Sequence, residues 1–500
     1  MTRKKKLILN TITSFSYQFL TVIVGFILPR YYISCYGSNV NGLQNSIIHF
    51  LGFVMILDSG VGAVVQSTLY KPLADHDEEQ ISKIMISAER FFKKIAVILI
   101  IYVIVLISLY PFSVKNEFSY AYTALLIVVI AISTFAQYYF CVTYRFLLAA
   151  DQKAYILYTI DGIAIIINTV LVVILIKLRT QIHFVRLITS IIYVGQVACL
   201  RFYVSRHYNL NKKLVLSTEP IKQKWNGFAQ HIASVVLTNT DTVVLTLFST
   251  LSSVSIYAIY HMIINGVKII VNALTSGIQA LFGNMLAKQE MKKLDETFSY
   301  IEWLLHTIVT LVFTMTGILI IPFVQIYTKG ITDANYVVPI FAIIITIAQG
   351  IYCIRLPYNM IVLAAGHYKE TQLSSIIEAS LNIAISVATV IKFGLVGVAI
   401  GTLIAMLYRT IYLAWYLKYH ILRRDIIIFL KHILVDFICV SLIVFITSKQ
   451  RLSSLTFTCW GIMAIKTGII SLLVGVAVNL IFYYSNIKQL CLSVKNKRKA

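Results

Sequence analysis

Long apolar stretches fill almost the whole chain, and short polar segments separate them. A helix needs roughly 20 apolar residues to cross a hydrocarbon core about 30 Å thick, and most of these stretches are that long. They predict an all-α polytopic membrane protein with about fourteen transmembrane helices. The expected spans are 7–33, 42–69, 91–112, 119–147, 154–177, 183–205, 226–249, 254–286, 301–327, 335–365, 371–391, 395–420, 426–447 and 457–484.

The second six spans repeat the first six at an offset of 217 residues. Ser59-Gly60 falls on Ser276-Gly277, and Asp161 falls on Glu378. Each repeat holds an even number of spans, so both enter the membrane in the same sense, as parallel repeats of transporters do. The sequence therefore predicts two parallel six-helix lobes plus two C-terminal helices. The expected parts are an N-terminal lobe over 1–206, a cytoplasmic connector over 207–225, a C-terminal lobe over 226–425, and two additional helices with a basic cytoplasmic tail over 426–500.

Polar residues recur at helical spacing on the first two spans of each expected lobe. Steps of three and four place each set on one helix face, which cannot point at lipid because unsatisfied polar groups are costly there. Hydrogen bonding between packed helices explains any one stripe, and it explains the histidines equally well. Four stripes in equivalent places favour a shared water-filled cavity between the lobes. The stripe residues that we expect at this cavity are Gln18, His49, His261, Asn265 and Asn272.

Several basic residues lie inside the expected spans, where a charge costs about 3 kcal/mol even on lenient scales. Lys268 and Arg355 lie near mid-span, and Arg30 follows Pro29 toward the end of the first span. An ionisable residue at such a depth is a candidate for function, so we predict that these three contribute to substrate binding. For Arg30 the alternative is a side chain that extends to the membrane interface.

Four acidic residues also fall in or beside the spans. They are Asp58, Asp161, Asp241 and Glu378. Each is a candidate for coupling to an ion. Asp161 and Glu378 are equally well explained as structural pins within the two lobes, and Asp58 as part of a helix bend.

The formal net charge of +23 would suggest nucleic-acid binding in a soluble protein, but 59% of the residues are hydrophobic and only 13% are charged. The basic residues gather in alternate connections, which is the positive-inside pattern of a membrane protein and places both termini in the cytoplasm. Lys177, Arg179 and Arg186 break this pattern. The basic N-terminus and first apolar run are interpreted as an uncleaved span rather than a signal peptide.

Neither metal nor enzyme chemistry finds support in the sequence. The seven cysteines form no pair at metal or redox spacing, and no phosphate-binding loop or nucleophile motif is present. We therefore expect no catalytic residue, no metal and no cofactor.

Three motifs resemble the polysaccharide repeat-unit (Wzx-type) flippases of the multidrug/oligosaccharidyl-lipid/polysaccharide exporter superfamily. They occupy 36–43 (YGSNVNGL), 57–62 (LDSGVG) and 65–73 (VQSTLYKPL), and Asn239-Thr240-Asp241 is similar to the seventh span of that family. The family often continues with Gly-x-Tyr, where this chain has Ser255-Ile256-Tyr257. The six-plus-six-plus-two plan extends the resemblance over the whole chain.

The resemblance implies a plasma-membrane flippase that moves an undecaprenyl-diphosphate-linked oligosaccharide from the cytoplasmic to the outer face by alternating access. It implies capsular, exopolysaccharide or O-antigen-type glycan assembly, with a glycan polymerase and other assembly proteins as partners and with no nucleic acid. We expect a monomer in the lipid bilayer. A diphosphate is an anion, so basic residues suit it. Two alternatives stay open: a drug/cation antiporter of the same superfamily, which would favour an acidic cavity, and a membrane glycan polymerase or transferase.

Overall fold

The computed structural model describes residues 3–58, 61–211, 214, 228–275 and 277–488. These residues are almost wholly helical and contain no strand. The chain forms two compact units, Met1–Ser255 and Ile256–Ala500. The expected lobe boundaries stay a prediction; helix α9, expected to open the second lobe, belongs to the first compact unit.

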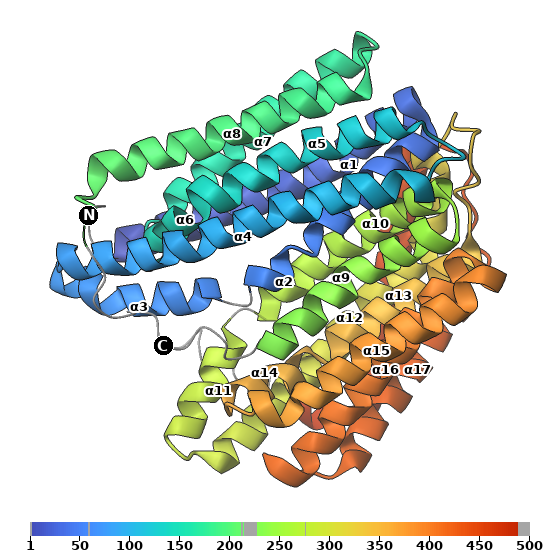
Figure 1. Cartoon of the computed structure of the whole chain (residues 1–500). Coiled ribbons are helices and arrows are strands. Elements are labelled where there is room, and N and C mark those ends of the chain that lie inside the picture. The colour runs from blue at the N-terminus through green and yellow to red at the C-terminus, as the bar shows by residue number, and fades with distance from the viewer. Residues whose placement is uncertain (1–2, 59–60, 212–213, 215–227, 276, 489–500) are drawn as a thin grey trace. The chain divides into compact units, whose positions relative to one another are not determined.

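The longer helices of the first unit run side by side (Figure 1). They are α1 (Arg3–Gly52), α2 (Met55–Asp58), α3 (Val61–Asp75), α4 (Glu78–Ser113), α5 (Tyr120–Ala136), a π-helix η1 (Gln137–Cys141), α6 (Val142–Ala150), α7 (Ala154–Lys177), α8 (Ile182–His207), α9 (Phe228–Phe248) and the start of α10 (Leu251–Thr275).

Helix α10 continues into the second unit. The helices that follow it are α11 (Ile278–Ala287), α12 (Met291–Tyr327), α13 (Pro339–Ile354), α14 (Leu356–Ala364), α15 (Tyr368–Phe393), α16 (Leu395–His420), α17 (Ile426–Thr447) and α18 (Phe457–Phe482).

The all-α membrane plan predicted from the hydrophobic pattern is confirmed. Among the described residues, thirteen helical segments are long and apolar enough to cross a membrane. The first of them, Lys5–Leu57, contains two legs, because α1 bends at Gly37. Its φ of 83° lies in the left-handed region, which glycine adopts without a steric penalty. The expected connection between the first two spans is therefore a single bend.

Large apolar side chains cover the outside of both units, as lipid contact requires. Phe445 is 79% exposed and Ile391 is 76% exposed, although both lie inside candidate membrane spans. Inside the first unit, Leu43, Ile47 and Phe92 are fully buried in one continuous apolar core. This core fixes α1 against α5 and α7, and it holds α8 against α5 and α7, while α9 makes its own contact with α1.

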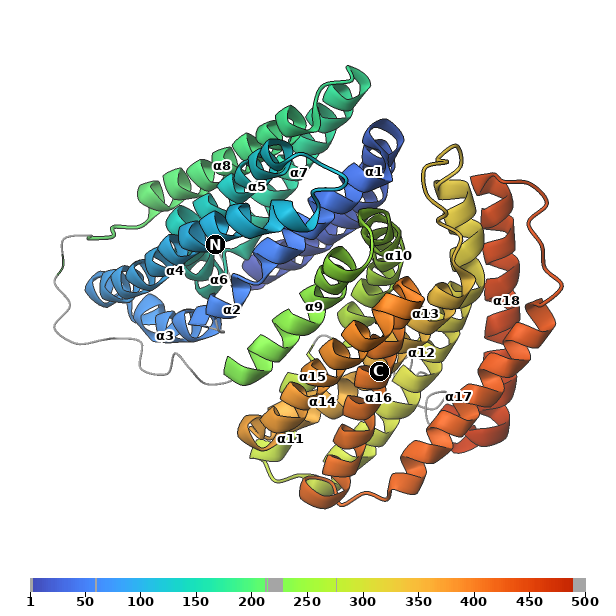
Figure 2. The same cartoon turned by 45° about the vertical axis from the view of Figure 1, so that its right-hand side comes forward.

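The second unit is built around α12, α13 and α16. Helices α15 and α16 form a closely packed hairpin, and α13 lies against α16. The last two helices, α17 and α18, run side by side and both pack on α12, as Figure 2 shows. Trp303 on α12 donates a hydrogen bond from Nε1 to Asn479 Oδ1 on α18 at 2.7 Å, which ties this pair to the unit.

Four of the expected continuous spans are interrupted. In the second span, α1 ends at Gly52 and α2 begins at Met55, and in the eighth span a turn at Gly277 precedes α11, which begins at Ile278. Of the two Ser-Gly pairs that the repeat aligns, Ser59, Gly60 and Ser276 lie outside the described residues. Gly277 has a φ of 89°.

The fourth and tenth spans are also interrupted at matching places. The π-helix η1 sits inside the fourth span, and α13 gives way to α14 at Arg355. At the repeat offset of 217, Arg355 corresponds to Tyr138 within η1. Pro357 explains the second interruption, because it has no backbone N–H and its ring would clash with the carbonyl of Cys353 in a continuous helix.

Candidate functional site

A polar pocket of about 290 Å³ lies inside the first unit, between the two legs of α1 and helices α7 and α8. Of its described lining residues, the charged one is Arg186, and Gln44, Asn41, Asn45 and Asn168 add amides. Thr21 and Gly25, in the first leg of α1, also line it. The shared cavity between the lobes that the polar stripes suggested stays a prediction.

Arg186 is held at this pocket by two contacts. Its Nε donates to Gln44 Oε1 at 2.9 Å, and its guanidinium lies over the Tyr32 ring, 4.7 Å from the centroid. Gln44 in turn donates to Asn41 Oδ1 at 2.8 Å. A guanidinium presents five N–H donors and Gln44 does not cancel its charge, so the pocket can hold an anion or sugar hydroxyls.

Amides extend this network. Asn45 donates to the Asn41 carbonyl at 2.8 Å, and Asn41 Nδ2 donates to Ser255 Oγ at 2.7 Å. Asn168 Oδ1 is buried and has no hydrogen-bond partner among the described residues. An acceptor that is buried without a partner costs free energy, so a hydroxyl donor from a ligand or a water would stabilise this position.

Of the site residues predicted from the sequence that fall in the first unit, Gln18 and His49 lie away from this pocket, and Asp58 is only partly described. Gln18 is exposed and bonds Ser14 Oγ at 3.2 Å, and His49 Nδ1 is 3.0 Å from Asn239 Oδ1 on α9. The Asp58 side chain lies outside the described residues. The contact of His49 matches the packing interpretation of the histidines.

The remaining first-unit residues, Arg30 and Asp241, are placed differently. Arg30 is half-buried in the first leg of α1, beside Pro29. Asp241 is buried in α9 with 2% exposure.

Asp161 is held by an arginine of the preceding span. Arg145 Nη2 and Nη1 donate to its two carboxylate oxygens at 2.6 and 3.1 Å, and Gln196 adds a third hydrogen bond. A bidentate pair of this kind neutralises the carboxylate and fixes α6 against α7. The geometry matches that expected of a structural pin.

In the second unit, Lys268 on α10 faces α13. Its Nζ donates to Gln349 Oε1 at 2.8 Å and lies 4.2 Å from the centre of the Tyr352 ring. Neither partner carries a negative charge, so these two contacts give Lys268 no counter-charge. Arg355 lies over the same ring at 4.7 Å, which brings the two predicted basic residues to one tyrosine.

Arg355 differs from Lys268 because an acid neutralises it. Its Nη1 forms an ion pair with Glu378 on α15, and Arg409 Nε on α16 lies 3.9 Å from the other oxygen of that carboxylate. All three side chains are buried. Two guanidinium groups against one carboxylate leave one positive charge in this cluster. Glu378 thus resembles Asp161, since each holds an arginine of the span before it.

The three other second-unit residues lie on α10. Asn265 Nδ2 is 3.0 Å from His261 Nδ1, and the His261 ring stacks on Tyr257 at 5.4 Å. Asn272 is exposed one turn beyond Lys268.

Sequence reasoning missed Arg186, Gln44, Gln349 and Arg409. A signal for Arg186 was present: it broke the positive-inside pattern although the expected span over 183–205 contained it, and the structure places it inside α8. The amides carry no such signal, because a lone Gln in an apolar span has the same pattern whether it faces a ligand or a neighbouring helix.

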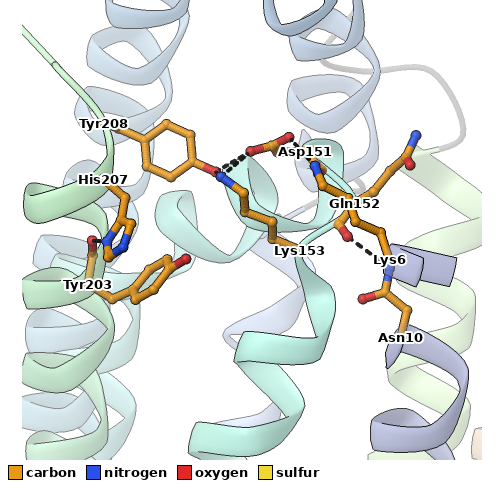
Figure 3. A network of polar contacts seen from close by, with 8 residues as sticks. All are labelled: Lys6, Asn10, Asp151, Gln152, Lys153, Tyr203, His207 and Tyr208. Carbon is orange, nitrogen blue, oxygen red and sulfur yellow. Dashed lines mark hydrogen bonds and ion pairs between the residues drawn. The ribbon is translucent and has the colours of Figure 1, made fainter. Parts of the chain in front are cut away.

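A second polar network lies at the end of the first unit where α1 begins (Figure 3). The Asp151 carboxylate pairs with Lys6 Nζ at 3.1 Å and Lys153 Nζ at 2.8 Å, and it accepts a hydrogen bond from the Tyr208 hydroxyl at 2.5 Å. Burial raises the pKa of Asp151, but the bonds from Lys153, Tyr208 and Lys6 outweigh it and hold the pKa below its ordinary value. Burial and Asp151 raise the pKa of Tyr208.

Comparison with known proteins identifies the fold. No protein-family model matches the sequence, and no curated protein is similar to it. Among solved structures, the lipid II flippase MurJ in an inward closed conformation superposes with a TM-score of 0.68 and 16% identity, over 96% of this chain and 100% of MurJ. An inward-facing multidrug resistance MATE family transporter of the MOP superfamily superposes with a TM-score of 0.62 and 12% identity, over 81% of this chain and 98% of that transporter. A mutant of the Vibrio cholerae MATE transporter VcmN superposes with a TM-score of 0.56 and 14% identity, over 84% of this chain and 98% of VcmN. The chain has the fold that these proteins share.

Proposed function

We propose that this protein is a flippase that carries an undecaprenyl-diphosphate-linked oligosaccharide across the plasma membrane, from the cytoplasmic to the outer face, by alternating access. The observation that carries the proposal is the extent of the fold match. The MurJ comparison covers 96% of this chain, whereas the two MATE comparisons reach 81% and 84%. The chain is thus matched nearly from end to end by a protein whose name states that it flips a lipid.

The charges of the two polar sites support the same substrate class. Arg186 in the first unit and Lys268 in the second have neutral amide partners, so each keeps a positive charge that suits a diphosphate or an acidic sugar. Amides and tyrosines beside them suit sugar hydroxyls and ring faces. A drug/cation antiporter is the second candidate, but it would favour an acidic cavity, whereas the charged lining residue of the first-unit pocket is Arg186. The glycan polymerase or transferase finds no supporting observation.

Proteoliposomes with a fluorescent diphosphate-linked oligosaccharyl lipid test the proposal. A membrane-impermeant lectin reports how much lipid reaches the opposite leaflet. The native protein should accelerate this movement. Lys268→Ala should slow it about tenfold or more, because a charge-assisted hydrogen bond contributes roughly 1.5–3 kcal/mol.

The matched control is Lys329→Ala, since Lys329 is an exposed lysine in the connection after α12. Its lipid movement should equal that of the native protein. Lipid movement no faster than in empty vesicles, together with uptake of a cationic dye, would replace the flippase by the antiporter.

A further inference from the structure

A buried polar cluster joins α12 to α17, and the proposed transport site makes no use of it. Glu302 and His306 of α12 are 1% and 2% exposed. They face His432 and Asp436, which lie one turn apart on α17. Titratable groups so deep in candidate membrane spans are costly, so their protonation state must keep the cluster close to neutral.

Glu302 already has its counter-charge. Arg424, just before α17, places Nη2 2.6 Å from Glu302 Oε2, and the Tyr358 hydroxyl of α14 donates to Oε1. These two charges cancel without any proton from solution.

His432 also fits its surroundings as a neutral ring. Its Nε2 lies 3.4 Å from Glu302 Oε2, and its Nδ1 lies 2.7 Å from the Tyr483 hydroxyl beyond α18. An N–H at Nε2 donates to the carboxylate, and a bare Nδ1 accepts from the tyrosine. The remaining cation nearby, Lys431, lies over the outer face of the Tyr483 ring at 5.0 Å and its side chain is exposed.

Asp436 has no such fixed counter-charge. It sits at the middle of α17, and among the described residues no lysine or arginine pairs with it. Its Oδ2 lies 2.5 Å from His306 Nδ1. Either an imidazolium faces a carboxylate, or a carboxylic acid donates to a neutral ring. Both arrangements are neutral overall and contain one more proton than a neutral histidine beside an ionised aspartate.

We propose that the joint between α12 and α17 is a binding site for one proton, held between His306 and Asp436, and that this proton keeps α17 seated on α12. The proton comes from water and returns to it, and only an N–H or O–H bond forms. A second proton is excluded, because the His432 ring stacks on His306 with centroids 4.8 Å apart and two imidazolium ions at that distance would repel. The inference does not depend on the substrate proposed above.

The protonation state of the other ring nitrogen of His306, Nε2, shows whether the proton is bound. Nε2 is buried and has no hydrogen-bond partner among the described residues. In both proton-bound arrangements Nε2 carries a hydrogen. After the proton leaves, the ring hydrogen belongs on Nδ1, where it faces the aspartate anion, and Nε2 becomes bare. The N–H bond at Nε2 breaks and its proton passes to water, but no hydrogen bond among the described residues is lost, because Nε2 makes none there.

Nitrogen-15 NMR of histidine-labelled full-length protein in lipid bilayers tests the site directly. His306→Gln assigns the resonance by deletion. We expect Nε2 of His306 to be protonated at pH 5 and bare at pH 9. In Asp436→Asn the transition should move to lower pH, because the anion that faces His306 Nδ1 is gone. A resonance that keeps one state from pH 5 to pH 9, or a transition that Asp436→Asn leaves in place, overturns the proton site.

Thermal unfolding across the same pH range tests the seating of α17. The native protein should lose stability as the pH rises, since proton loss leaves an uncompensated carboxylate in the span. The double variant His306→Gln/Asp436→Asn carries no such charge, so its unfolding temperature should depend less on pH. His183→Gln, a half-buried histidine at the start of α8, should keep the native dependence. Equal pH dependence in the double variant and the native protein would refute the link between proton and seating.

Discussion

At the scale of single residues, charge partners decide which of the ionisable side chains are available to a ligand. Arg145 and Arg355 are each paired with a buried carboxylate, whereas Arg186 and Lys268 meet neutral amides. A paired charge mainly fixes neighbouring helices, because removing one partner leaves the other uncompensated. The residues with neutral partners are therefore the better candidates for anion binding.

Asp151 provides a test of charge pairing outside the spans. Its pKa is lowered in the folded state, so its contribution to stability is complete above its ordinary pKa of 3.8 and is lost as the pH falls through the lowered value. At pH 6, Asp151→Asn should lower the free energy of unfolding by about 1–2 kcal/mol, because three donors lose a charged acceptor. The unfolding temperature should fall accordingly. The difference from the native protein should shrink at pH 3. A difference that stays constant between the two pH values would show that the carboxylate charge is not its source.

At the scale of elements, bends and interruptions shape the helices more than the hydrophobic pattern suggests. A bend at Gly37 divides α1, Pro357 separates α13 from α14, and η1 interrupts the fourth span. An interruption frees backbone groups from the helical ladder, and such places recur at functional sites. The matching positions in both repeats indicate that the interruptions belong to the repeated unit itself.

Gly42 tests how closely two elements of the first unit approach each other. A Cβ at this position would lie 1.8 Å from the carbonyl oxygen of Leu251, which opens α10. Gly42→Ala should force the two backbones apart and destabilise the protein by about 1–3 kcal/mol. Thermal unfolding measures the effect. The control is Gly195→Ala, where a Cβ meets nothing within 4 Å and the helix should gain slightly. Equal unfolding temperatures for Gly42→Ala and Gly195→Ala would mean that α10 moves away from α1 without loss of stability.

At the scale of the whole molecule, alternating access requires contacts that break during each cycle. The beginning of α10 touches the second leg of α1 through Ser252, which donates to Asn39 Oδ1, and through Ser255, which contacts Asn41. Both contacts involve short polar side chains, which separate at a lower energetic cost than an apolar interface of the same size. We propose that they form a gate.

A disulfide between Asn39→Cys and Ser252→Cys, in a background without the native cysteines, should lock this gate. Lipid movement in the proteoliposome assay should stop when the bond forms and return on reduction. The control pair, Ser249→Cys and Ser253→Cys, joins side chains that already lie 3.1 Å apart, one just after α9 and one in the first turn of α10, so its oxidation should leave transport intact. Full transport by the oxidised Asn39–Ser252 pair would rule out this gate.

The sequence alone predicted the class of fold and most of the helix boundaries. The expected spans over 154–177, 395–420 and 426–447 coincide with α7, α16 and α17. The physical reason is that a membrane helix must satisfy its own backbone hydrogen bonds and match the hydrocarbon thickness, so length and hydropathy suffice to locate it. The sequence predicted continuous spans where the structure has the η1 π-helix and the change from α13 to α14 at Arg355, because hydropathy alone does not register a local change in backbone geometry.

Only the tertiary structure decided which polar residues meet. Lys268 and Gln349 lie 81 residues apart, and Arg186 and Gln44 lie 142 apart, so no local pattern connects them. His306 and Asp436 are separated by 130 residues and meet because α17 packs on α12. Helix packing in a membrane depends on shape and a few hydrogen bonds rather than on hydrophobicity, because every outward face is already apolar. The sequence therefore places the helices, and the packing of side chains between them places the sites.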